Sequence, residues 1–237
     1  MQRISISAVI ILASVLTLAV PAVLAGKPRV SPARSHPYGK TYGEWAAAFW
    51  QWGLVLPLEG HPFADTNPNY DLSANQSGKV WFWSAPDGLP PFTRTSTLPA
   101  GTALFLTLLD AECSSVETPD SGFHGDTEAE QRDCAKFWAD HIVGLFCEID
   151  GVAVQDIHAY RFSTPQFEFT APTPWIFGAV GGTGTSVGDG YFLMLAPLHE
   201  GPHIIHYGGA FHFAAGEFGD NEEFDVAKDV TINLTVE

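Results

Sequence analysis

The sequence predicts a mainly β fold, a single-domain β-sandwich or jelly roll that carries two short helices. Short apolar runs bounded by Pro and Gly recur along the chain, as expected of strands separated by turns. About 200 residues follow the N-terminal apolar segment, which suits one domain with one core, at residues 41–237. The expected strands are residues 79–84, 102–109, 145–149, 152–154, 161–170, 191–196, 203–207 and 230–236.

The first helix is expected at about residues 41–54. Thr41 and Glu44 have the spacing of a capping box, in which each side chain binds a backbone N–H group of the other residue. Three aromatic residues follow at helical spacing and predict a buried face: Trp45, Phe49 and Trp52.

The second helix is expected at about residues 127–143. Thr127 and Glu130 form another capping box, and Gly144 suits the helix end. The residues expected to face inward are Cys134, Trp138 and Ile142.

Two segments give the clearest strand signals. Asp150-Gly151 lies between two apolar runs and is typical of a tight β-hairpin turn. In residues 230–236, Val, Ile and Leu alternate with Thr and Asn, so one face of this strand is expected to be buried.

The first 25 residues resemble a cleavable secretory signal peptide. Arg3 precedes an apolar segment, and Val23-Leu24-Ala25 has the small-residue pattern of a cleavage site. An uncleaved membrane anchor is the alternative, which Pro21 disfavours because it breaks the helix. No later segment is long and apolar enough to cross a bilayer. We therefore expect a secreted or periplasmic protein without a transmembrane segment after cleavage.

The chain is strongly acidic. Arg3 is the one charged residue of the first 25, so their removal leaves 27 acidic residues against 10 of the 11 basic ones, a formal charge of −17. Such a surface repels nucleic acids and favours cations. Residues 26–40 differ, because they contain four basic residues and three prolines but no acid. They are expected to form a flexible arm, either a spacer or an interaction segment.

Three cysteines in an exported chain predict one disulfide and one spare thiol. Cys134 falls on the inward face of the second helix, and we expect it to pair with Cys113 across an acidic loop. Cys147 lies in an expected strand, where a small buried apolar residue is a better interpretation than a nucleophile.

Spaced motifs across residues 41–209 resemble a group of secreted bacterial proteins to which no activity is assigned. The resemblance implies export and one domain, and it implies nothing about substrate. The motifs are residues 42–45, 49–52, 61–62, 76–82, 99–101, 149–151, 189–191, 197–198 and 203–206.

A metal site is one candidate for function. Imidazoles and carboxylates suit a divalent transition metal, but His203 and His206 point to opposite faces of a regular strand. The alternative is that these histidines cap turns or bind backbone carbonyls. An acidic run at residues 217–225 lacks the ligand spacing of a calcium loop and is expected to be solvated, with weak calcium binding as the alternative. The candidate metal ligands are His199, His203, His206 and His212.

Aromatic and acidic pairs are the other candidates. Trp81 and Trp83 share one face of an expected strand, where they could stack on a polysaccharide or belong to the core. Asp110 and Glu112 lie at the end of a strand, where acids can act together or simply be solvated. If a polar pocket exists, we expect it where this acidic pair, His61 and His206 converge.

Residues 184–188 match the glycine-serine pattern of a hydrolase nucleophile elbow but lack the required strand before and helix after it. A mobile surface loop or lid is the expected structure of the glycine-rich segment 178–190. The sequence therefore favours a non-catalytic binding or surface-interaction module, with a polysaccharide or surface partner. The alternative is a metal-binding protein or metalloenzyme with a divalent ion. No other cofactor is indicated.

Overall fold

The computed structural model describes residues 29–178, 180–217 and 221–237. The expected signal peptide, residues 1–25, lies outside the described residues. Two sheets pack face to face, so the predicted β-sandwich with two helices is confirmed. Among the described residues, no helix combines the length and the apolar character needed to cross a membrane.

Sheet A has the strand order β1-β3-β8-β6, and β7 pairs with a separate part of β8. Every pairing in this sheet is antiparallel except the parallel β1–β3 pair. Its strands are β1 (Val80–Trp83), β3 (Ala103–Ser114), β6 (Arg161–Ser163), β7 (Phe167–Thr170) and β8 (Thr183–Leu195).

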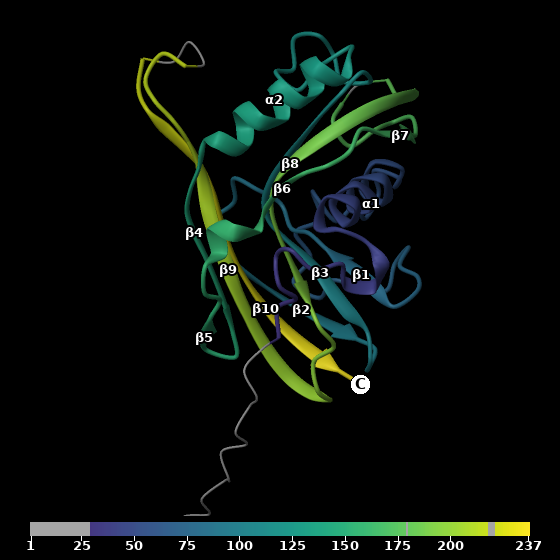
Figure 1. Cartoon of the computed structure of the whole chain (residues 1–237), viewed down its shortest axis with the longest axis vertical. Helices are drawn as coiled ribbons and strands as arrows, with labels where there is room; N and C mark the ends of the chain where they lie inside the picture. Colours follow the sequence, from purple (N-terminus) through teal and green to yellow (C-terminus); the bar gives the residue numbers. More distant parts are fainter. Residues whose placement is uncertain (1–28, 179, 218–220) are drawn as a thin grey trace, which may run out of the picture.

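Sheet B has the order β2-β10-β9-β4-β5 (Figure 1). Here β2 pairs parallel with β10, and the other pairs are antiparallel. Its strands are β2 (Phe92–Leu98), β4 (Ile142–Ile149), β5 (Val152–Ala153), β9 (Gly201–Phe213) and β10 (Phe224–Val236). The predicted turn between β4 and β5 is present, with positive φ angles at Asp150 and Gly151, as a tight hairpin requires.

The main core lies between the two sheets. Alternate residues of β10 and β9 point into it, as the period of two requires, and meet leucines of β3 and β8. Helix α1 (Tyr42–Leu54) covers the opposite face of sheet A (Figure 1), where Phe49 packs with Phe105 and Phe192 in a second cluster. Thr41 forms the predicted capping box with Glu44.

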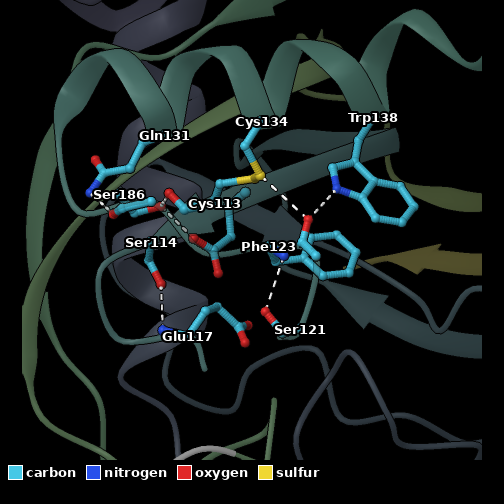
Figure 2. Close-up of a disulfide and its surroundings, with 12 residues drawn as sticks. Cys113, Ser114, Glu117, Ser121, Phe123, Gln131, Cys134, Trp138 and Ser186 are labelled. Carbon is cyan, nitrogen blue, oxygen red and sulfur yellow. Dashed lines mark hydrogen bonds between the residues drawn. A yellow bond between two sulfur atoms is a disulfide. The ribbon is translucent and has the colours of Figure 1, made fainter. Parts of the chain in front are cut away.

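Helix α2 (Glu128–Asp140) lies across one end of the sandwich, between β9 and β8 (Figure 1). Its predicted capping box, Thr127 with Glu130, is present. The predicted disulfide between Cys113 and Cys134 is confirmed and joins α2 to β3 (Figure 2). Trp138 packs from the helix against Phe211 and Phe213 of sheet B, so α2 closes the space between the sheets.

Strand β2 was not expected from the sequence, and four further local expectations differ from the structure. The second helix ends at Asp140, and Ile142 begins β4. The expected strand 161–170 is broken near a proline into β6 and β7. The segment 183–190, expected to be a mobile loop, is the first half of the buried strand β8. From residue 29 onward the basic arm is docked, because Val30 forms a β-bridge with Leu195.

The fourth correction has a clear physical basis. Beyond the Val30 bridge, the Tyr42 hydroxyl donates to the Ser31 carbonyl at 2.6 Å, and the Trp45 indole donates to the Pro37 carbonyl at 2.8 Å. Aromatic side chains of α1 therefore hold a segment whose composition alone predicts flexibility.

Candidate ligand-binding cavity

A cavity of about 480 Å³ lies beside the edge of β3. Strand β1 ends at Trp83 and pairs with β3 only as far as Leu106, whereas β3 continues to Ser114. At Ser114 the edge is covered again, because this residue bridges to His124. Between these points, among the described residues, no strand pairs with this edge of β3, and the cavity occupies this position.

Aromatic side chains make up much of the wall. They come from α1, α2, sheet B and three loops, so the cavity is formed where all these elements meet. The aromatic wall residues are Phe49, Trp50, Phe63, Phe123, Trp138, Phe177 and Phe211. Figure 2 shows Trp138 and Phe123 stacked beneath α2, near the loop that carries Glu117.

A β-bulge determines which residues of β3 reach the cavity. The pairing of β3 with β8 shifts between Thr107 and Leu109, and both Leu108 and Leu109 enter the core between the sheets. After the bulge, the alternation of side chains between the two faces of β3 is therefore shifted by one residue. As a result, Asp110 and Glu112 lie on the face of sheet A that α1 covers. Both residues line the cavity.

Burial keeps the carboxyl groups of Asp110 and Glu112 protonated. Desolvation raises the pKa of Asp110 to about 8, although Lys228 lowers it. Desolvation also raises the pKa of Glu112 to about 8, against the hydrogen bond that the Ser186 hydroxyl can donate to the ionised carboxylate. Asp110 is only partly buried as a residue, but its Oδ2 atom is covered. Both groups therefore hold protons at neutral pH.

The hydrogen bonds of Glu112 agree with a protonated carboxyl group. The Ser186 hydroxyl contacts both Glu112 Oε2 and the Cys113 carbonyl oxygen, the latter at 3.0 Å. A hydroxyl has one proton to donate. Both contacts are satisfied when Glu112 donates its own proton to Ser186 and Ser186 donates to the Cys113 carbonyl.

One lysine also reaches the cavity. Lys228 is 3 % exposed, and its Nζ lies 2.7 Å from Asp87 Oδ1. Nearby Asp87, Tyr207 and Asp110 raise its pKa against the opposing and larger effect of desolvation, so the ammonium group stays charged. Glu117, another wall residue, is buried, and desolvation raises its pKa.

Three polar atoms of the wall have no hydrogen-bond partner within the described part of the chain: Trp50 Nε1, Asp110 Oδ2 and Glu112 Oε1. Buried polar atoms are normally paired, because leaving one unpaired costs about 1–3 kcal/mol. The cavity thus combines an apolar wall with one free indole donor and two free carboxyl oxygens. This combination suits the binding of a small molecule that has an apolar body and a polar group.

The structure brings only part of the predicted pocket together. Asp110 and Glu112 meet in the cavity, but His61 and His206 do not line it. His61 is buried beside Phe63, with Nε2 3.0 Å from the Gly53 carbonyl oxygen. His206 lies on the other face of sheet B and contacts Asp229 at 2.9 Å.

The four C-terminal histidines do not converge. The rings of His199 and His203 are neighbours, but both nitrogens of His203 are engaged, with Asp150 at 2.7 Å and the His199 carbonyl at 2.8 Å. His206 and His212 contact different partners, Asp229 and Asp225. Across the described ranges, no three His, Cys, Asp or Glu side chains are grouped as metal ligands.

The tryptophan pair is divided between two environments. Trp83 is fully buried, and its indole donates to the Tyr207 hydroxyl at 2.9 Å, so it belongs to the core. Trp81 is half-buried and lines a second, more polar pocket beside Tyr70 and Thr95. Cys147 is buried and outside the disulfide, and burial raises the pKa of its thiol to about 12, which suits an unreactive core residue.

The sequence interpretation missed several cavity residues, above all Lys228 and Trp50. The alternation of residues 230–236, extended two residues toward the N-terminus, places Lys228 on the inward face. Trp50 gives no such signal, because it lies one position from the predicted stripe of Phe49. No family model, curated protein or solved structure matches this chain.

Proposed function

We propose that this chain is an exported, non-catalytic binding module that holds a small molecule with an apolar body and a polar group in the cavity beside β3. The observation that carries the proposal is the cavity itself, about 480 Å³ with aromatic walls and unpaired polar atoms. Sites for small ligands are concave and mostly apolar, and a few polar groups in them fix the ligand's orientation. The cavity volume falls within their usual range of roughly 300–1,000 Å³.

Location outside the cytoplasm is part of this proposal. The N-terminal sequence pattern and the Cys113–Cys134 disulfide both support it, because disulfides persist in oxidising compartments.

A fluorescent probe tests the binding function. The neutral aromatic compound N-phenyl-1-naphthylamine should become brighter when it enters the cavity, because it leaves water. Ala111 is a buried wall residue, so Ala111→Phe should fill the space and abolish the enhancement. Ala227→Phe is the matched control, since Ala227 is exposed on β10 and outside the cavity wall.

Ala111→Leu fills less space and should weaken the enhancement without abolishing it. Thermal melting of each variant shows that it is folded. If folded Ala111→Phe protein binds the probe as the parent does, the cavity is not the binding site. If the parent gives no enhancement, the proposed function is wrong for this class of ligand.

A further inference from the structure

We propose that the polar group of the ligand is a protonated amine, bound by Asp110 and Glu112. This inference rests on the proposed binding function and names the chemical class of the ligand. An organic cation with an aromatic or alkyl body would place its ammonium group at the acidic pair and its body among the aromatic side chains.

The distribution of acidic and basic groups favours a cation. The wall contains four acidic residues, and one lysine that is already paired with Asp87. Because Lys228 is paired with Asp87, the wall offers no other basic side chain as a partner for Asp110, Glu112 and Glu117. The whole chain also carries a formal charge of −16, which attracts cations to its surface.

Two of the three free polar atoms of the wall match the donors of an ammonium group. Asp110 Oδ2 and Glu112 Oε1 are buried acceptors without a partner in the described residues. An ammonium group has three N–H donors and no acceptor, so it can satisfy both oxygens. A carboxylate ligand would bring two more acceptors and a negative charge beside the acidic pair, which such a site disfavours.

The aromatic walls add to the preference. Cations bind over the faces of Trp, Tyr and Phe rings, which carry partial negative charge. Trp50 and Phe49 of α1 line the cavity on the face of β3 from which Asp110 and Glu112 project. The cavity therefore has both kinds of group that bind amines, aromatic ring faces and carboxyl groups.

Binding of an amine should release protons to solvent. In the free protein the two carboxyls are protonated, and an ammonium ion beside them favours the ionised form, so each ionised carboxyl releases one proton. The charged and titratable groups around the pair are Lys228 of β10, Tyr207 of β9, Asp87 of the segment after β1, and Glu117 and His124 of the loop after β3. Asp189 of β8 is paired with Arg161.

Three phenylpropyl compounds provide the test, because they share one apolar body. The probes are 3-phenylpropylamine, 3-phenylpropanol and the anion 3-phenylpropanoate, titrated by calorimetry. We expect the amine to bind at least about tenfold more tightly than the alcohol, as charge-assisted hydrogen bonds are the stronger ones. The anion should bind more weakly than the alcohol.

Proton release gives a second, independent measurement. The apparent binding enthalpy of the amine should differ between phosphate and Tris buffers in proportion to their ionisation enthalpies. Its affinity should rise with pH between about 6 and 8, by up to about tenfold per pH unit for one released proton, while the amine stays charged because its pKa is near 10. The affinity of the alcohol should not change.

Two isosteric variants locate the effect. Asp110→Asn and Glu112→Gln should lose most of the preference for the amine over the alcohol and part of the proton release. Glu168→Gln changes an exposed glutamate outside the cavity wall and should behave as the parent does.

The possible results separate the two proposals. If no phenylpropyl compound binds although N-phenyl-1-naphthylamine does, the amine inference is wrong and the proposed function stands; if the naphthylamine does not bind either, both fail. If amine and alcohol bind equally and no proton is released, the cavity binds small molecules but the amine inference is wrong. It is also wrong if both isosteric variants retain the full preference for the amine.

Discussion

At the residue scale, two glycines of β8 allow the cavity wall to form. Gly188 faces Glu112 across the strand pair, and Gly190 faces Asp110. A Cβ atom at Gly188 would lie 2.6 Å from Trp50 Nε1, and one at Gly190 would overlap the backbone of Asp110. Glycine is needed at these positions because neighbouring atoms leave no room for a side chain, and not because the backbone is flexible. In the sequence alone, such glycines look the same as the glycines of a loop.

Gly190→Ala should destabilise the protein, because the added methyl group meets backbone atoms that cannot rotate away. We expect a loss of about 2 kcal/mol or more, as for other overpacked cores. Gly182→Ala is the matched control, since no atom lies within 4 Å of its added Cβ. Urea unfolding measures both variants, and equal stabilities would contradict the close approach.

At the scale of elements, the starts of both helices were predictable, whereas strand β2 and the first half of β8 were not. Capping boxes are local signals, so Thr41 and Thr127 indicated where α1 and α2 begin. The first half of β8 was missed because its glycines are explained only by partners far away in sequence. Asp110 and Glu112 were identified as an acidic pair, but the helix and sheet that cover them, and hence their burial, follow from tertiary packing.

The disulfide that joins α2 to β3 should stabilise the protein mainly by restricting the unfolded chain. Cys113 and Cys134 are 21 residues apart, and closing a loop of this size contributes about 3 kcal/mol. The double variant Cys113→Ala/Cys134→Ala should lose roughly that amount in urea unfolding. Because Trp138 of α2 lines the cavity, the variant should also bind the neutral probe more weakly.

A reductant serves as the control for this prediction. It should lower the stability of the parent toward that of the double variant and leave the variant unchanged. A parent that is equally stable with and without reductant, once complete reduction is confirmed, would contradict the stabilising role of the bond.

At the scale of the whole molecule, the buried acids should make stability depend on pH. In the unfolded chain Asp110 and Glu112 ionise near their ordinary pKa values of 3.8 and 4.5, whereas in the folded protein both pKa values are about 8. Between these limits the folded state binds more protons than the unfolded state. The contribution of this pair to stability is therefore fully present at low pH and is lost as pH rises to about 8.

Asp110→Asn and Glu112→Gln should remove this dependence, because amides do not ionise. At about pH 8 each variant should be more stable than the parent by roughly 4 kcal/mol, and at about pH 4 the difference should shrink toward zero. The free energy of unfolding at several pH values measures this, with Glu168→Gln as the control. Parallel pH profiles for parent and variants would show that both carboxyls ionise freely in the folded protein.

The position of β10 has a consequence for how the chain reaches this fold. It lies between β9, the preceding strand, and β2, which is made far earlier. Strand β2 is synthesised long before β10. The backbone groups of β2 that pair with β10 therefore have no partner until β10 leaves the ribosome. Sheet B can therefore close only late in synthesis, after β10 has left the ribosome.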